Sequence, residues 1–395
     1  MSHPVIAGTG MTTFGKFLAS TVRSLANDAA ELALLDAGVR PRQVEQVFFS
    51  NATSGLLTGQ EMIRGQVALR DLGLSAVPVV NVENACASGS TAVHLAATSI
   101  AAGEADIILV VGSEKLSHED KARTFAALGS AVDLERLDQV KAGLYGENVP
   151  ASADRSFFMD VYAQMASTYM EQSGATQSDF AAVAAKSHQN ARLNPYASAH
   201  RSVSAEEVAA SRHITGPLTL LMCSPVSDGA AAIVMMSDRK AAELGLACVT
   251  VRASAMASGL GADDPVAVAV SKAYELAGLG PADVDVVELH DAAAPAELIM
   301  YETLGLCSPG EGPRLLASGD TAITGRIPVN PSGGLVGKGH PVGATGVAQI
   351  VELVEQLRKR AGDRQVPRAR VALAENGGGY LGPNPAAATI TILSV

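Results

Sequence analysis

Apolar positions along the chain alternate between a strand period and a helix period, and this pattern predicts repeated β-α-β units. Residues 77–82 form an apolar, β-rich run with the length of a buried strand. A helix is predicted directly after it, because apolar residues recur at helical spacing at Val93, Ala96, Ala97 and Ile100. The N-terminus shows the same alternation, with strands predicted at residues 5–7 and 44–49 and, between them, a helix at 26–37 that ends at Gly38.

The second part of the chain repeats the first. Residues 36–41 return as residues 276–281, and the segment Cys86-Ala-Ser-Gly returns as His340-Pro-Val-Gly. Strand-like runs correspond in the same order, 106–111 with 370–374 and 230–235 with 386–392. Self-similarity of this kind indicates a duplicated architecture. We therefore expect two related α/β halves, at residues 1–245 and 246–395.

Each half is expected to hold a mostly parallel sheet with helices on its faces. Ligands of such sheets bind beyond the strand ends. If the halves pack about a pseudo-twofold axis, Cys86 and His340 become equivalent helix starts that face one another. The segment 113–217 interrupts the first half and is too long for a plain loop. Helical patterns at 157–169 and 179–190 predict a small added domain there, with substrate cover as its expected role.

Composition narrows the class of protein. A chain of 395 residues is too long to fold around a single ordinary hydrophobic core. Its content of 48% hydrophobic and 17% charged residues is typical of a compact protein. The net charge of −11 argues against a general nucleic-acid surface but allows a local basic patch for an anionic ligand. Four widely spaced cysteines and eight histidines show no metal-ligand spacing, so we expect no metal and a reducing compartment. Without a recognisable signal peptide or membrane-length apolar run, a soluble cytoplasmic protein is expected.

Cys86 is the residue with the clearest chemical potential. It stands where the predicted strand runs into a helix, and helix N-termini favour a thiolate over a thiol. Glycine and serine beside it leave room for a bulky acyl group. The alternative is an inert, buried cysteine. Two segments are rich in glycine. In residues 330–346 the glycines allow close backbone approach, and in residues 375–380 backbone N–H groups can converge on an oxyanion. Neither segment has the spacing of a phosphate-binding loop.

Several motifs together make the chain resemble the thiolase superfamily, in particular thiolases of the sterol-carrier-protein type. The resemblance covers nearly the whole length and rests on Asn84-Ala85-Cys86-Ala-Ser-Gly-Ser, Ser227-Asp228-Gly229, His290-Asp291, Glu302-Thr-Leu-Gly305 and Gly339-His340-Pro341. It implies a duplicated α/β fold in which two mixed sheets sandwich central helices in five layers. A loop domain that binds coenzyme A and a tight homodimer are also implied.

The resemblance assigns roles to four residues. Cys86 becomes the nucleophile that acyl-CoA acylates, and His340 becomes the base that activates it and later donates a hydrogen bond to a thioester oxygen. His290 would hold a water or the substrate oxygen, with a structural role beside Asp291 as the alternative. The backbone N–H of Gly378 would complete the oxyanion hole together with that of Cys86.

One departure from the family pattern changes the expected reaction. Thiolases of this type carry a second cysteine in a His-Asp-Cys-Phe motif, where this chain has Ala292. Other thiolases place that cysteine before a glycine-rich turn, where this chain has Glu375. Alanine has no proton to exchange, and a glutamate serves near neutral pH only if burial raises its pKa. Glu375, Cys307 and Tyr380 are candidate substitutes, and a structural role is the alternative for each.

The sequence thus predicts a thiolase-like acyltransferase that forms an acyl-enzyme on Cys86 and has a modified second half-reaction. Coenzyme A thioesters are expected as substrates, without a permanently bound cofactor. One alternative is an ordinary 3-ketoacyl-CoA thiolase with an unidentified acid/base. Another is a thiolase-like subunit that works with a small OB-fold partner carrying a zinc ribbon.

Overall fold

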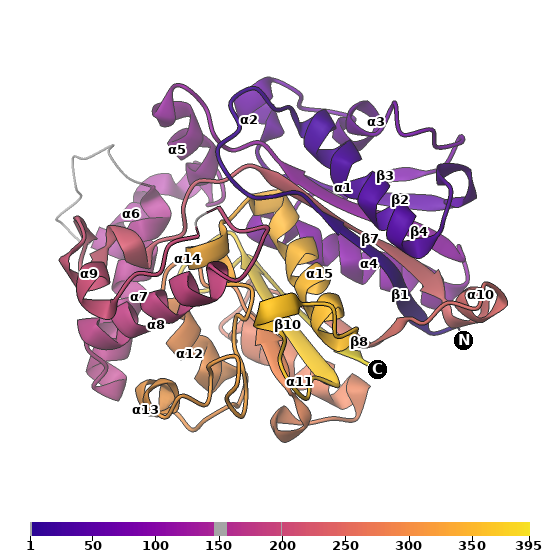
Figure 1. The fold of residues 1–395 in the computed structure, drawn as a ribbon. Helices are drawn as coiled ribbons and strands as arrows, with labels where there is room; N and C mark the ends of the chain where they lie inside the picture. Colours follow the sequence, from indigo (N-terminus) through magenta and orange to yellow (C-terminus); the bar gives the residue numbers. More distant parts are fainter. Residues whose placement is uncertain (1, 146–155, 199) are drawn as a thin grey trace.

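Nine strands form one continuous sheet in the computed structural model, which describes residues 2–145, 156–198 and 200–395 (Figure 1). Their order across the sheet is β3-β2-β4-β7-β1-β8-β11-β10-β9. The strands are β1 (Pro4–Met11), β2 (Gln46–Ser50), β3 (Val79–Val82), β4 (Ile107–Glu114), β7 (Gly229–Ser237), β8 (Val249–Ser258), β9 (Val286–Glu288), β10 (Val371–Gly378) and β11 (Ala387–Ser394). The short strands β5 (His213–Thr215) and β6 (Leu218–Thr219) pair separately.

The sheet has two halves with the same internal order. From the middle outward, β1, β7, β4 and β2 in the first half correspond to β8, β11, β10 and β9 in the second. The halves meet where β1 pairs with β8 at Val5↔Thr250 and Ile6↔Val249. The predicted duplication is therefore visible in the strand order. The two expected sheets are joined along this pair of strands into one.

The expectation of mostly parallel halves is wrong, and each half is mixed. Only β2 with β3, β2 with β4, and β9 with β10 pair in parallel, while the other neighbours are antiparallel. The connection from β10 to β11 is short, and a short connection between adjacent strands can only be made by reversing the chain. Periodicity does not reveal strand direction, which is why the pattern alone predicted mostly parallel halves. The mixed sheets implied by the family resemblance are confirmed.

Helices complete the five expected layers. α1 (Val22–Ala37) packs on the outer face of the first half, and α11 (Pro265–Ala277) packs on that of the second. Between the halves lie α4 (Ser88–Ala102) and α15 (Thr345–Leu357), each of which contacts strands of both halves (Figure 1). The buried helix α15 carries a polar stripe, Gln349, Glu352 and Gln356, whose side chains are satisfied by hydrogen bonds to neighbouring segments.

The insertion in the first half forms helices that gather at one side of the molecule (Figure 1). They are α5 (Lys121–Gly129), α6 (Leu137–Tyr145), α7 (Phe157–Ser173), α8 (Gln177–Ala191) and α9 (Ala205–Ala210). α7 and α8 lie where the periodicity predicted them, whereas residues 146–155 and 199 of the expected loop domain are outside the described residues. The remaining helices are α2 (Ser54–Thr58), α3 (Arg64–Ala68), α10 (Asp238–Glu243), α12 (Pro295–Thr303), α13 (Gly312–Ala317) and α14 (Gly334–Lys338). Among the described residues, no helix is both long and apolar enough to cross a membrane.

The N-terminal ends of α4 and α15 touch backbone to backbone. A Cβ added at Gly346 of α15 would lie 2.3 Å from the backbone nitrogen of Ser90, and one added at Gly89 of α4 would lie 2.9 Å from that of Val347. Glycine is required at these positions because the helices cross without room for a side chain. This contact fixes the separation of the two helix starts, and therefore of the residues that precede them.

We predict that Gly346→Ala destabilises the protein by about 1–3 kcal/mol, because the added methyl must push two buried backbones apart. Chemical denaturation followed by circular dichroism measures the change. Gly129→Ala is the matched control, since an added Cβ there meets no heavy atom of the described residues within 4 Å. The control should stay within about 0.5 kcal/mol of the parent. Equal unfolding midpoints for Gly346→Ala and the parent would contradict the tight crossing.

Candidate active site

Cys86 sits in a short 3-10 turn, Ala85–Ala87, between β3 and α4. Ala85 has a left-handed backbone with φ of 49°, an unfavourable conformation for a residue with a Cβ. Two contacts hold it there, because its N–H donates to the Glu83 carboxylate at 2.6 Å and its carbonyl accepts from the Ser88 hydroxyl at 2.6 Å. The turn brings the Cys86 sulfur to the start of the helix, as predicted.

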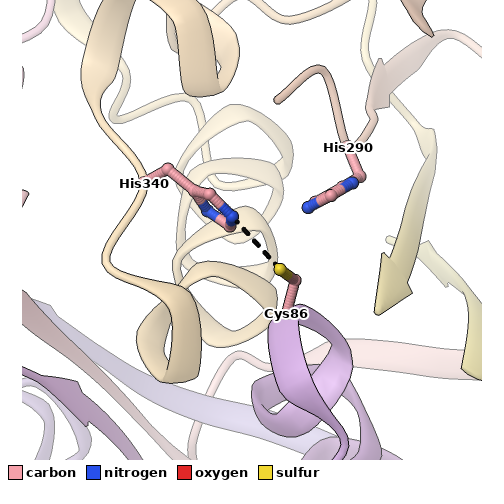
Figure 2. Close-up of side chains that lie close together, drawn as sticks. All are labelled: Cys86, His290 and His340. Atoms are coloured by element: carbon pink, nitrogen blue, oxygen red, sulfur yellow. Dashed lines mark hydrogen bonds between the residues drawn. The ribbon is translucent and has the colours of Figure 1, made fainter. Parts of the chain in front are cut away.

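His340 faces Cys86 from the equivalent turn before α15, and its Nε2 lies 3.3 Å from the sulfur (Figure 2). Its Nδ1 lies 2.7 Å from the hydroxyl oxygen of Thr345, and that hydroxyl donates to the carbonyl of Pro341 at 3.0 Å. The hydroxyl has a single proton, so it must accept from Nδ1–H. Nε2 is then unprotonated and free to accept the thiol proton.

Burial keeps this pair neutral in the resting protein. It raises the pKa of the Cys86 thiol to about 12, with the nearby charge of Glu114 acting in the same direction. Burial also holds the pKa of His340 well below its usual 6.5, and the neighbouring His290 adds to this. The expectation that the helix start favours a thiolate is therefore wrong in its net direction. Amide N–H groups at the sulfur do lower its pKa, but desolvation outweighs them.

His290 completes the cluster from the loop after β9. Its ring centroid is 5.1 Å from that of His340, and the side chain points toward Cys86 (Figure 2). Burial lowers the pKa of His290 to about 4, so its ring is neutral. Among the described residues its Nε2 has no hydrogen-bond partner. A buried ring nitrogen without a partner beside a nucleophile can bind a substrate oxygen or a water.

The backbone donors at the sulfur are the N–H groups of Gly379 and of Cys86 itself. The predicted donor was Gly378, one residue earlier. Gly378 instead packs against the cysteine turn, because a Cβ there would lie 2.3 Å from the Asn84 carbonyl. Gly379 leaves the strand with φ of 67° and presents its amide. Three consecutive glycines give no sequence signal for which one turns inward.

A cavity of about 1390 Å³ opens in front of the cluster. Its apolar wall comes partly from the inserted helices, at Phe125, Met159, Tyr162 and Met165. Cationic side chains also line it, at Lys16, Arg64, Lys121 and Arg212. The sequence left the residues for coenzyme A unassigned, and these four are the ones that could hold its anionic part.

The three candidate substitutes for the second cysteine separate in space. Glu375 and Tyr380 line the cavity, but Cys307 does not. Cys223 also lines the cavity, and its sulfur contacts the Thr219 carbonyl at 3.5 Å. Thr345, which fixes the imidazole of His340, was missed in the sequence although it lies only five residues beyond the histidine.

The sulfur of Cys86 and one ring nitrogen each of His290 and His340 lie within 4.8 Å of one another. Among the described residues, this is the one group of side chains that could hold a metal ion. We interpret them as catalytic and not as metal ligands, because the sulfur and His340 Nε2 already share a proton across 3.3 Å. A sulfur, a base and an unpaired ring nitrogen thus meet where the two duplicated α/β halves join, and this is the arrangement that covalent catalysis through a cysteine requires.

The chain belongs to the thiolase family. The family model for the thiolase N-terminal domain matches residues 4–239, and that for the thiolase C-terminal domain matches residues 247–394. The prediction of a thiolase-type acyltransferase of the sterol-carrier-protein kind is thereby confirmed at the level of the family.

Two relatives and one solved structure illustrate the relationship. Acetyl-CoA acetyltransferase of Methanothermobacter thermautotrophicus is 37% identical over 388 residues, which cover 96% of this chain and 97% of that protein. Sterol carrier protein 2 of Bos taurus is 36% identical, with 94% of this chain matching 69% of it. The solved Ltp2-ChsH2(DUF35) aldolase superposes with a TM-score of 0.80 at 25% identity, covering 100% of this chain and 98% of that one.

We predict that His340→Ala slows alkylation of Cys86 by iodoacetamide about 100- to 10,000-fold at neutral pH. In the parent protein the imidazole accepts the thiol proton wherever it is itself neutral, so the rate should be flat near neutral pH and fall only in acid. In the variant the thiol must ionise unaided, and its rate should rise about tenfold per pH unit. The exposed His213→Ala serves as control. A variant with the parent's flat profile would remove His340 as the base.

Proposed function

We propose that the chain transfers an acyl group from a coenzyme A thioester to Cys86 as its first half-reaction. The observation that carries this proposal is the neutral Cys86–His340 pair, in which Thr345 leaves Nε2 ready to accept the thiol proton. The sulfur attacks the thioester carbonyl while Nε2 takes its proton. When the tetrahedral intermediate collapses, His340 returns that proton to the departing thiolate, so coenzyme A leaves as a thiol.

Charge on the carbonyl oxygen needs donors during this step. The candidate donors are His290 and the backbone amides of Gly379 and Cys86. The two amides already lie at the sulfur, and Nε2 of His290 has no other partner among the described residues. Removal of one such donor typically costs about 3 kcal/mol of transition-state stabilisation. The cationic residues Lys16, Arg64, Lys121 and Arg212 would hold the phosphates, and the apolar wall would hold the acyl chain.

The second half-reaction departs from the two-cysteine pattern. Ala292 lines the cavity where the family motif has a cysteine, and no thiol stands at position 375. The acyl group on Cys86 therefore passes to its acceptor with a different acid/base. Whether the enzyme acts as an ordinary 3-ketoacyl-CoA thiolase depends on whether such a group exchanges the α-proton.

A second candidate role is that of a subunit in a complex. It is favoured by the Ltp2-ChsH2(DUF35) aldolase, whose name joins two components and which matches this chain over its whole length. A small partner protein bound near the cavity would then complete the substrate site. Acylation of Cys86 by the isolated chain would show that the partner is not needed for the first half-reaction.

We predict a covalent acyl adduct on Cys86 after incubation with acyl-CoA. Intact mass should show one acyl group per chain, and peptide mapping should place it on Cys86. Cys86→Ala should abolish the adduct, while Cys248→Ser, which lies outside the cavity, should keep it. An adduct on Cys223 or Cys307, or none with acetyl-, propionyl- or hexanoyl-CoA, would contradict the proposed function.

We also propose that a second copy of the chain covers the free edge of β3. This strand ends the sheet, and Val80 on it is 37% exposed. Beside it, α3 is tied to β3 by hydrogen bonds, and the preceding Met62 and Ile63 are 77% and 59% exposed. An unpaired edge strand with exposed apolar neighbours can pair with a strand of another chain, and a homodimer would bury both the edge and these side chains.

We predict that the parent protein sediments as a dimer and that Val80→Lys shifts it toward the monomer. The lysine places like charges opposite each other across a twofold edge and so opposes pairing. Val268→Lys on α11 is the matched control, since that valine is exposed on the other half of the molecule. A monomeric parent protein would overturn this interface.

A further inference from the structure

Glu375 is the only buried carboxyl group of the described residues that lines the cavity. It lies on β10, between β9 and β11, and its side chain is 2% exposed. The backbone is fixed, because its carbonyl accepts from the Gln349 amide of α15 at 2.9 Å. Since β9 and β10 are parallel and pair as far as Ala374↔Glu288, Glu375 stands near the β9 end that leads to His290.

Its carboxyl group is half satisfied. Oε2 accepts from the backbone N–H of His290 at 2.9 Å, whereas Oε1 has no hydrogen-bond partner among the described residues. No described cation lies within ion-pair distance of it. Several other buried carboxylates are ion-paired away from the cavity, as in the pairs Asp228–Lys115, Glu297–Lys186 and Glu352–Arg364. Buried Asp291 also has an oxygen without a partner among the described residues, Oδ2, but it does not line the cavity. Glu375 therefore combines an unpartnered oxygen with a place in the cavity wall, which Asp291 lacks.

The surroundings of Glu375 suit a group that both takes and gives a proton. Burial raises the pKa of Glu375 to about 7, the charge of Asp264 before α11 adds to this, and the His290 N–H opposes it. Tyr162 of α7 is the other titratable group that interacts with it, and burial raises the pKa of that phenol well above 10. Near neutral pH the carboxyl group is thus poised between its two forms, while the phenol stays protonated.

We infer that Glu375 is the catalytic acid/base that exchanges the α-proton of the substrate in the second half-reaction, through its unpartnered Oε1. This inference rests on the proposed function. In the direction of synthesis, Oε1 takes the proton from the α-carbon of a second acyl-CoA, and the electron pair left on that carbon attacks the thioester carbonyl on Cys86. The new C–C bond forms as the C–S bond breaks. The proton on Glu375 and the electron pair on the Cys86 sulfur then restore the carboxylate and the thiol.

Cleavage runs through the same atoms in reverse. Cys86 attacks the 3-keto carbonyl, the C–C bond breaks, and the enolate of the departing acyl-CoA takes its proton from Glu375. The substrate class is therefore a thioester with an acidic α-hydrogen. A carboxyl group would do the work of a thiol, and the α-proton would be exchanged without a second cysteine.

The test measures deuterium uptake at the α-carbon of acetyl-, propionyl- or hexanoyl-CoA in heavy water, by mass spectrometry, beside single-turnover acylation of Cys86. Glu375→Gln keeps an oxygen for the His290 N–H but cannot take a proton. We expect it to lose exchange by about 100- to 10,000-fold while Cys86 is still acylated. Glu375→Cys should recover part of the exchange, with its optimum at higher pH because a thiol ionises there.

Asp264→Asn separates a chemical role from a structural one. Asparagine caps α11 as well as aspartate does, but it removes the charge that raises the pKa of Glu375. Exchange needs the carboxylate form, so the acid limb of its pH profile should move to lower pH. If the acid limb of the pH profile of α-proton exchange does not move, Glu375 is not the group whose titration controls the exchange.

The outcomes distinguish this inference from the proposed function. If the parent protein forms no adduct on Cys86, the proposed function fails. If Cys86 is acylated and Glu375→Gln exchanges α-protons as fast as the parent, the inference alone fails, and Tyr162 or Tyr380 becomes the group to test. An acylated parent protein that exchanges no α-proton with any of the three thioesters would also overturn it.

Discussion

The backbone contact between α4 and α15 is the constraint on which the site depends. Gly89 and Gly346 let the two helices meet without intervening side chains, so the turns before them lie close enough for Cys86 and His340 to share a proton. Each helix also packs on strands of both halves, and the contact therefore joins the duplicated sheets as well. Rigid elements that hold a reacting pair at a fixed distance provide the preorganisation that nucleophilic catalysis needs.

The same burial that fixes the geometry decides the protonation states. Enclosure between the two halves of the sheet removes water from Cys86 and His340, and this favours the neutral forms of both. The pair thus stores no separated charge before substrate binds. Thr345 prepares His340 as a base without supplying a charge, because its hydroxyl determines which imidazole nitrogen carries the proton. Transfer of the proton can accompany attack, when developing charge on the substrate oxygen has donors to receive it.

Much of this arrangement could be predicted from short sequence features. The likeness of the Cys86 and His340 turns indicated the duplication, and the motifs named the residues that the structure brings within 4.8 Å of one another. What failed depended on three-dimensional surroundings. Strand direction follows from connections and not from periodicity, so the mixed sheets followed only from the family resemblance. Which glycine presents its amide depends on where β10 ends, and the net shift of the Cys86 pKa depends on a burial that no local pattern reveals.

Glu375 illustrates how a functional group differs from a structural one in the same core. Its pKa in the folded protein lies above that of an exposed glutamate, so ionisation between the two values weakens the folded state as pH rises. Asp228 has the opposite balance, because Lys115 and several hydrogen bonds hold its pKa below the ordinary value and its charge supports the fold above that value. A carboxyl group left with one free oxygen at a cost in stability, on a fixed strand that lines the same cavity as the nucleophile, is placed for chemistry.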